Sequence, residues 1–339
     1  MTTVWFIVLT LMMAVYAVLD GFDLGVGSIM LFLCKNEEER EQARHAIGPV
    51  WNGNEVWLLA GGGAMFVAFP HLYAASFSGF YLALMLVLWL FMLRGIGYEF
   101  RHVIKNVMWT GVWDAAFGVA SALLALLFGV AVGNVLRGVP LNAAGEFQGS
   151  LFFLLNPFAL VAGLLSVAVI SLHGAAYLVL KTEGELKERA RKYANVALIA
   201  SGVLALVLAG ASWLVRPDFT ANFLHAPIIL AVPVLAVAAF IIIQLGLKTP
   251  NKSDFTAFAG TTLLIVGLLG SAAVGLFPRM LPCLGEHADL DLTIANSSAG
   301  NHGLVVALIA NLIGMSFVVV YTTWIYKVWV GKVRVGEYH

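Results

Sequence analysis

Long apolar runs follow one another along nearly the whole chain, and short polar segments separate them. Most of the runs hold 20 to 24 residues, the length that a helix needs to cross a bilayer. The pattern therefore predicts an all-α polytopic membrane protein with about nine transmembrane helices. We place them at about 4–33, 50–69, 76–97, 110–133, 151–179, 194–215, 227–247, 257–277 and 303–326.

Four of these runs carry further expectations. The first and fifth are near 30 residues long, so they must tilt, break or project from the membrane. The second and third meet at Pro70-His71, which predicts a tight helical hairpin. The first run starts at Val4 with no basic segment before it, so we interpret it as a retained helix and not as a removed signal peptide.

Composition and charge agree with this pattern. The 339 residues are 61% hydrophobic and only 11% charged, too few charges to cover a soluble surface. The formal net charge is zero, and no basic face points to nucleic acid. We find no phosphate-binding loop, no metal-ligand spacing of Cys and His, and no hydrolase motif in the sequence.

Lys and Arg are distributed unequally between the two sets of loops. Of the 19 basic residues, all but Arg137, Arg216 and Arg279 flank the same ends of the predicted spans. The positive-inside rule places the basic ends in the cytoplasm, the N-terminus outside and the C-terminus inside. Cys34 and Cys283 then lie on opposite sides of the bilayer and cannot form a disulfide with each other.

A faint repeat suggests how the spans are grouped. Charged segments at 35–44 and 181–191 each follow an overlong run, and four spans separate them. The architecture we draw is two four-helix bundles plus one additional helix. Its segments are 1–133 (first bundle), 134–150 (external loop), 151–277 (second bundle), 278–302 (external loop) and 303–339 (ninth helix and cytoplasmic tail).

Ionisable residues inside the spans are concentrated in the first half. Such groups are expensive to place in a bilayer and are often functional. Asp20, Asp23, Glu55 and Asp114 lie there, whereas no acid lies within a span of the second half. His173 is the one histidine well inside a span, and a lone buried histidine is more often a packed, hydrogen-bonded residue than a haem ligand.

The segment 20–27 admits two interpretations. Asp20 and Asp23 share one helix face, and the three glycines of the segment let another backbone approach. The pair then forms a cation or proton site, or meets a buried group of a partner. Alternatively, the glycines break the overlong helix and the aspartates cap its second piece.

The segment 51–57 opens the second span with Asn52 and Glu55 spaced by three residues. Its two tryptophans suit an interfacial aromatic belt. We interpret Glu55 as functional, and Arg94 as a candidate counter-ion of Glu55 or Asp23. Asp114 suits either a functional or a hydrogen-bonded interfacial role.

From the residues alone, two functions remain. One is an ion-coupled secondary transporter that uses Asp20 and Asp23. The other is a non-catalytic subunit of a membrane redox complex. A transporter is expected to have polar or broken helices in both repeats, and the second half lacks them.

The chain resembles subunit II of cytochrome bd-type quinol oxidases over most of its length. The resemblance rests on the joint order of six segments: 20–27, 51–57, 75–81, 133–140, 155–158 and 292–298. It implies an electrogenic oxidase in the bacterial cytoplasmic membrane that oxidises quinol and reduces O₂ to water with protons from the cytoplasm. It implies no cofactor within this chain, because a larger partner, subunit I, carries two haems b and one haem d. The family also allows a bound quinone and a small single-helix subunit.

The resemblance implies that Asp20 and the 51–57 segment serve a proton route. This chain departs from the family pattern, which has Asp at position 52 and Gln at position 55. Asn52 cannot titrate, and one interpretation is that the acid has moved by one helical turn to Glu55. If the first helix is unbroken, Asp23 and Asp20 lie roughly 16 and 21 Å from its cytoplasmic end. We therefore expect a proton route that runs from Glu55 to Asp23 and then to Asp20.

Overall fold

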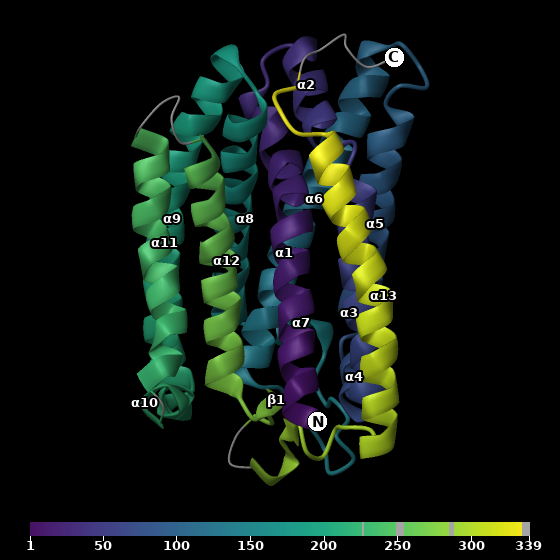
Figure 1. Ribbon diagram of the computed structural model, residues 1–339, viewed down its shortest axis with the longest axis vertical. Coiled ribbons are helices and arrows are strands. Elements are labelled where there is room, and N and C mark those ends of the chain that lie inside the picture. The colour runs from purple at the N-terminus through teal and green to yellow at the C-terminus, as the bar shows by residue number, and fades with distance from the viewer. Residues whose placement is uncertain (226, 249–253, 285–287, 334–339) are drawn as a thin grey trace.

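The computed structural model describes residues 1–225, 227–248, 254–284 and 288–333. Most of the helices run side by side along one long axis (Figure 1). The α-helices are α1 (Thr2–Leu33), α2 (Glu37–Ile47), α3 (Trp51–Ala68), α4 (Pro70–Gly79), α5 (Tyr81–Phe100), α6 (Val107–Arg137), α7 (Leu151–Leu154), α8 (Pro157–Lys181), α9 (Gly184–Val215), α10 (Ala221–His225), α11 (Ala231–Lys248), α12 (Asp254–Leu276) and α13 (Asn301–Val328). Short 3₁₀ helices are η1 (Pro217–Thr220), η2 (Pro227–Leu230) and η3 (Ala288–Leu290), and the strands are β1 (Arg279–Leu281) and β2 (Leu292–Thr293).

In the described part of the chain, eight helices are long and apolar enough to cross a membrane: α1, α5, α6, α8, α9, α11, α12 and α13. The prediction of an all-α polytopic membrane protein is confirmed. The predicted second span corresponds to α3, which is not among the eight. Its first turns carry Asn52, Asn54 and Glu55, and these side chains lower its mean hydropathy.

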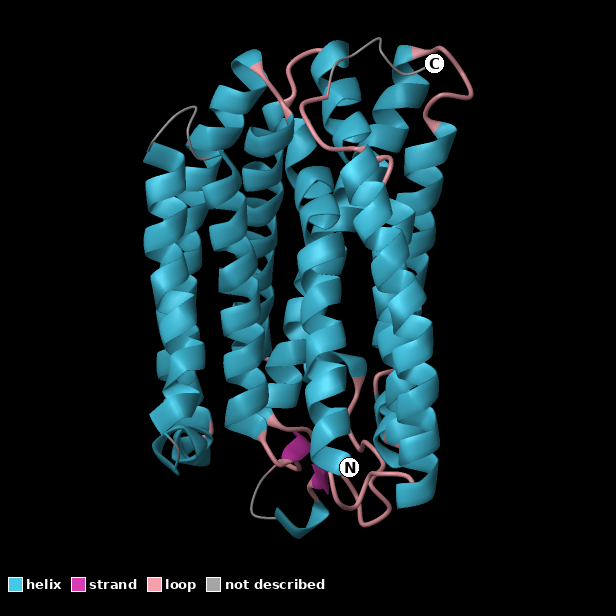
Figure 2. Cartoon of the chain, in the orientation of Figure 1, coloured by secondary structure: helices cyan, strands magenta, loops and turns pink. Residues whose placement is uncertain are grey.

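The two ends of the molecule differ in character. One end carries α2 and the α5–α6 and α8–α9 connections, where many of the basic residues lie (Figure 1). The other end carries the small β1–β2 ladder and long loops (Figure 2). Both cysteines are free and buried, in agreement with the expectation that they do not pair. Lys252 and Arg334, counted among the basic flanks, lie outside the described residues.

Helix α1 is continuous through its glycine-rich centre, so the interpretation that the glycines break it is wrong. The glycines instead allow α1 to approach α8. A Cβ atom on Gly25 would lie only 2.1 Å from the carbonyl oxygen of Ile170, and one on Gly174 would lie 2.3 Å from Gly25. The close contact between α1 and α8 accounts for the small residues in α1. No break in α1 is needed to explain them.

Three predicted boundaries change for local reasons. The overlong fifth run divides into α7 and α8, where the Asn156 side chain caps α8 and Pro157 occupies its first turn. The tight hairpin at Pro70-His71 is wrong, since Pro70 begins the ten-residue helix α4. The charged segment 181–191 is largely the first part of α9, whereas the segment 35–44 contributes to the separate helix α2.

Helix contacts show which elements hold the structure together. Helix α1 packs against α3, α6, α8 and α12, and α8 also packs against α6 and α9. Helix α11 pairs with α12, α5 with α6, and α13 lies against α3. The division into two four-helix bundles and a ninth helix stays a prediction. The contacts of α1 and α6 with α8 join the two halves closely and place the acids of α1 in the interior.

Candidate functional site

The predicted acids Asp20 and Asp23 and the predicted counter-ion Arg94 meet inside the helix assembly. All three residues are fully buried, with 0% of their surface exposed. Asp20 and Asp23 come from α1, and Arg94 comes from the second half of α5. The continuous α1 carries both acids on its interior side, because they are one helical turn apart.

Arg94 joins two of the acids. Its Nη2 lies 3.0 Å from Oδ1 of Asp20, and its Nη1 donates a hydrogen bond to Oε1 of Glu55 at 2.5 Å. Tyr16 donates a further hydrogen bond of 2.8 Å to Oδ2 of Asp20. The Glu55 side chain retains 28% of its surface, so this acid lies at the edge of the cluster. Within the described residues, Arg94 therefore pairs with Asp20 and Glu55 and forms no ion pair with Asp23.

Asp23 is held by a different set of contacts. Its Oδ2 accepts a hydrogen bond of 2.7 Å from Nδ2 of Asn54, which also donates to the carbonyl oxygen of Leu19 at 3.1 Å. Tyr326 of α13 donates to Oδ1 of Asn54 at 3.0 Å. Among the described atoms, Oδ1 of Asp23 has no hydrogen-bond partner. The predicted order of the route, from Glu55 to Asp23 and then to Asp20, therefore differs from the observed contacts. Arg94 links Glu55 directly to Asp20, and Asp23 lies on a separate branch.

Asn52 does not take part in this cluster, because its side chain is exposed. Asn54, one of the residues that the sequence interpretation missed, occupies the interior instead and is 1% exposed. A signal for it was present in the helix. The buried positions of α3 recur at helical spacing and include Asn54: Trp51, Asn54, Trp57, Gly61, Ala64 and Ala68. Tyr16 and Tyr326 were also missed, and their positions depend on how distant helices pack.

The cluster has more acids than cations. Three carboxyl groups share the site with one guanidinium, so full ionisation would leave a net charge of −2 in a mostly buried place. Uncompensated charge in a low-dielectric interior costs several kcal/mol. The arrangement is therefore stable when at least one of the carboxyl groups carries a proton. A site of this kind can accept and release protons without a change of fold.

A second ionic cluster lies at the basic end. Asp114 accepts hydrogen bonds from Nε of Arg101 at 2.7 Å and from Nη1 of Arg44 at 3.5 Å, and Arg40 pairs with it at 3.4 Å. Arg101 also pairs with Glu37 of α2. Asp114 on α6 therefore connects to α2 and to the end of α5. These contacts favour the hydrogen-bonded role that the sequence analysis considered for Asp114.

His173 uses both ring nitrogens within the protein. Nδ1 lies 2.7 Å from the hydroxyl of Thr261, and Nε2 lies 3.0 Å from the carbonyl oxygen of Val18. Its ring stacks on Phe258 at 4.8 Å. Ligation of haem iron would break one of these hydrogen bonds, so the residue does not fit an axial ligand. The described residues contain no group of three or more His, Cys, Asp and Glu side chains that could hold a metal ion.

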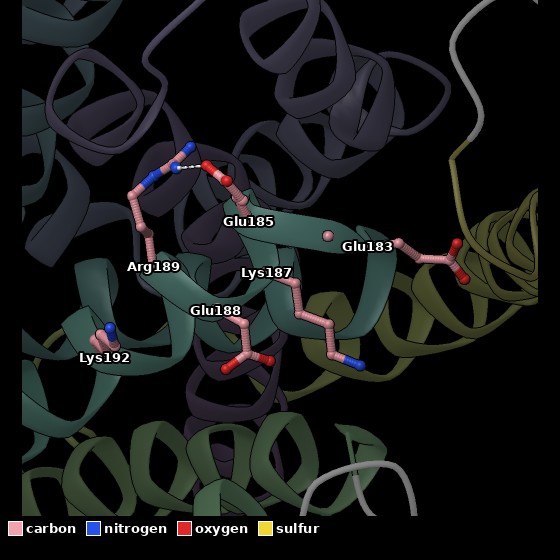
Figure 3. A pocket seen from close by; sticks show the side chains of 7 residues that line it. Glu183, Glu185, Lys187, Glu188, Arg189 and Lys192 are labelled. Carbon is pink, nitrogen blue, oxygen red and sulfur yellow. Dashed lines mark hydrogen bonds and ion pairs between the residues drawn. The ribbon is translucent and has the colours of Figure 1, made fainter.

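Two cavities lie at the basic end of the helices. An open depression of about 670 Å³ adjoins the start of α9, where Arg189 pairs with Glu185 across one helical turn (Figure 3). Both acidic and basic side chains line this depression, so its electrostatic potential does not favour ligands of one charge. A second cavity of about 20 Å³ has room for about one water molecule. It is lined by His45, Ala46, Pro49, Val50, Tyr177, Lys181, Tyr326, Trp329, Val330, Gly331, Lys332 and Val333.

Comparison with known proteins extends over nearly the whole chain. Residues 1–329 match the family model described as cytochrome bd terminal oxidase subunit II. The chain is 35% identical to the probable cytochrome oxidase subunit 2 of Haemophilus influenzae, with 95% of this chain and 92% of the relative aligned. It is 32% identical to the cytochrome bd-I ubiquinol oxidase subunit 2 of Escherichia coli, with the same coverage, and 33% identical to the cytochrome bd ubiquinol oxidase subunit 2 of Bacillus subtilis, with 95% and 94% aligned.

The fold also has a counterpart among solved structures. The bd oxidase of Geobacillus thermodenitrificans contains a chain that superposes with a TM-score of 0.79, covering 97% of this chain and 98% of that chain. At 16% sequence identity, this likeness supports the fold alone. The comparisons give no support to a secondary transporter.

Proposed function

The chain belongs to the cytochrome bd terminal oxidase subunit II family, and from this premise we propose that its buried acids conduct protons for the oxidase. The chain is one subunit of an oxidoreductase complex, and its function in that complex is to support the haem-bearing subunit I. The charge balance among Asp20, Asp23, Glu55 and Arg94 carries the proposal. A group of three carboxyls and one guanidinium keeps at least one exchangeable proton where few other polar groups are available.

The route begins at Glu55, whose side chain is 28% exposed in the isolated chain, and continues to Asp20. Arg94 touches both acids, so a proton that leaves one of them changes the charge felt by the other. Asn52 is not a step of this route, since its amide does not titrate and its side chain is exposed.

A partner subunit covers Glu55 in the proposed complex. An ionisable side chain in a membrane helix is not stable against lipid and normally faces protein or a water-filled cavity. Glu55 lies on α3, and α13 packs on the same helix with Leu304 as its one buried residue. We therefore place the contact with subunit I on the face that α3 and α13 form.

The basic end of the molecule faces the cytoplasm in this proposal, with the N-terminus outside and the C-terminus inside. The inequality of basic residues between the loops supports this orientation. A reporter that is active only in the cytoplasm should be active when fused after residue 339. It should be inactive when it is inserted between Arg137 and Gly149, and the opposite pattern would reverse the orientation.

The haems belong to subunit I in this proposal: two haems b and one haem d. The engagement of both ring nitrogens of His173 supports it. Expressed without its partner, the chain should show no stoichiometric Soret band, and a band that disappears in His173→Ala would contradict the proposal. A bound quinone and a small single-helix subunit are compatible with the family, and mass spectrometry of the intact purified complex would detect either one.

The test of the proton route compares assembly with turnover. Asp20→Asn and Glu55→Gln keep the shape of the side chains and remove the titrating group. We expect both variants to assemble with full haem content and to reduce O₂ more slowly, by at least tenfold for Asp20→Asn, because removal of an acid–base step usually costs 10²-fold or more. Asn52→Ala is the matched control and should retain the wild-type rate.

Two other outcomes would end the proposal. If Asp20→Asn and Glu55→Gln both turn over at the wild-type rate from pH 6 to 8, the acids carry no essential proton. If the two variants fail to assemble while Asn52→Ala assembles, the acids serve only to hold the helices together.

A further inference from the structure

Tyr326 connects the last helix of the chain to the first. It lies near the end of α13, and its hydroxyl donates to Oδ1 of Asn54 at 3.0 Å. Asn54 in turn donates from Nδ2 to Asp23 at 2.7 Å and to the carbonyl oxygen of Leu19 at 3.1 Å. Residues from three helices that are far apart in the sequence therefore form one chain of hydrogen bonds that ends on a buried acid.

The hydroxyl of Tyr326 satisfies the carbonyl oxygen of the Asn54 amide and supports the orientation in which the NH₂ group faces Asp23. Asn54 is 1% exposed, so each of its polar atoms must find a partner inside the protein. The NH₂ group faces two acceptors, Asp23 and Leu19, and the carbonyl oxygen faces the O–H of Tyr326. The opposite orientation would place an oxygen against two oxygens. Without the hydroxyl, the carbonyl oxygen of the amide would be buried with no donor, which costs about 1–3 kcal/mol.

The end of α13 is itself fixed, so Tyr326 has a defined depth. Gly331 has φ +114°, a left-handed conformation that favours glycine, and it turns the chain back after α13 ends. Lys181 donates to the carbonyl oxygen of Trp329 at 2.6 Å, and the backbone N–H of Val333 donates to the carbonyl oxygen of Lys181 at 2.8 Å. These bonds attach the segment 329–333 to the end of α8.

We propose that Tyr326 is a positioning residue for Asp23: through Asn54 it holds a hydrogen-bond donor on Oδ2 and leaves Oδ1 as the oxygen that carries and exchanges the proton. Oδ2 accepts from Asn54, whereas Oδ1 is buried and has no partner among the described atoms. The proposal rests on the proposed function for its effect on turnover. The state of the Asp23 carboxyl can be observed whether or not protons follow this branch.

Several ionisable groups surround Asp23, and the test leaves all but one of them in place. The substitution Tyr326→Phe removes one hydroxyl, so a difference from the wild type reports the contact with Asn54. The groups that face Asp23 from its own helix and from neighbouring helices are Asp20 (α1), Glu55 (α3), Arg94 and Tyr98 (α5), Tyr177 (α8) and Tyr326 (α13).

The first experiment uses infrared difference spectroscopy on the assembled oxidase. The carboxylic C=O band of Asp23 is identified by its loss in Asp23→Asn. We expect Tyr326→Phe to displace this band, because the Asn54 amide that donates to Oδ2 loses the hydroxyl that holds it in position. The control Tyr321→Phe, on the same helix with an exposed side chain, should leave the band in place. An unmoved band in Tyr326→Phe, or the absence of any band lost in Asp23→Asn, would overturn the proposal.

The second experiment measures the pH profile of O₂ reduction. An amide donor stabilises the carboxylate form, so a donor that is held less well should move the alkaline limb of the profile to higher pH in Tyr326→Phe. We expect roughly half a pH unit, about a threefold change in rate on that limb. A displaced infrared band with an unchanged pH profile would mean that Tyr326 orients Asp23 but that protons do not pass through Asp23. In that case the further inference stands and the proposed function fails for this branch.

A double-mutant cycle tests whether Tyr326 acts through Asn54. In an Asn54→Ser background, the further substitution Tyr326→Phe should displace the Asp23 band by less than it does in the wild type, since the intermediate amide is already absent. Equal displacement in both backgrounds would show that Tyr326 acts on Asp23 by another path and would overturn the assignment.

Discussion

The pairing of Arg94 with Asp20 can be tested through its energy. Nη2 of Arg94 and Oδ1 of Asp20 are 3.0 Å apart, and both side chains are 0% exposed. At an effective dielectric constant of about 20, two unit charges at this distance attract by about 5 kcal/mol. Breaking a buried pair by removing one partner typically costs 3–5 kcal/mol. Glu55 contributes less to the site, because 28% of its side chain is exposed and solvent screens its charge.

The perturbation is a double-mutant cycle with Arg94→Gln, Asp20→Asn and both together. Arg94→Gln removes the cation from among three acids and should cost about 3–5 kcal/mol. Asp20→Asn leaves Arg94 with Glu55 alone and should cost somewhat less. In the double variant, Gln and Asn can hydrogen-bond to each other without a net charge. We expect a coupling free energy of about 3 kcal/mol between the two positions.

The assay is graded detergent denaturation of the purified oxidase, followed by tryptophan fluorescence and haem absorbance. The partly exposed pair Arg216 and Asp218 provides the control cycle, with an expected coupling below about 1 kcal/mol. If the losses of Arg94→Gln and Asp20→Asn add to within about 0.5 kcal/mol in the double variant, the two charges do not interact. That result would refute the charge balance on which the proposed proton route depends.

Two further predictions concern the packing of the helices and the loops at the far end of the molecule. Gly174→Ala should reduce the yield of assembled oxidase in membrane extracts at least tenfold, because the added Cβ would lie 2.3 Å from the backbone of Gly25. The control Gly210→Ala should leave the yield unchanged, since no atom lies within 4 Å of a Cβ at that position. The hydrogen bond from Arg216, aided by the nearby Arg279, lowers the pKa of Asp218 to about 2, below its ordinary value of about 3.9. Asp218 therefore stabilises the fold above pH about 4 and loses this effect as the pH falls to about 2, so the thermal stabilities of the wild type and Asp218→Asn should converge over that range; a constant difference would contradict the pairing.

Helix positions followed from the sequence wherever the apolar runs were long and bounded by charge. The runs at 110–133 and 303–326 lie within α6 and α13, and the run at 257–277 ends one residue beyond α12. Boundaries were wrong where polar residues continue a helix beyond its apolar part, as in α9, which begins at Gly184 and not near residue 194. Hydropathy identifies the part of a helix that can lie in the hydrocarbon core. The helix can continue beyond the membrane surface through polar residues that favour helix formation.

The candidate site was predicted in part. Asp20, Asp23, Glu55 and Arg94 were identified because ionisable residues are rare in apolar runs. Asn52 was selected because the related family has Asp at this position and because it lies three residues from Glu55, but in the structure Asn52 is exposed and Asn54 is buried. Spacing along a helix identifies residues that share a face, and it does not identify which face is turned toward the interior.

The sequence by itself determined that this protein is a polytopic membrane protein and that the acids within its predicted spans lie in the first half. Both conclusions depend on the cost of placing polar groups in hydrocarbon, which each residue incurs independently of its neighbours. Only the tertiary structure decided which acid pairs with Arg94. It also decided that Tyr326 forms a hydrogen bond with Asn54, which is 272 positions away in the sequence. Those contacts depend on the relative rotation and depth of packed helices. The close approach at Gly25 and Gly174 and the other helix contacts fix this geometry jointly, so no single segment of the sequence encodes it.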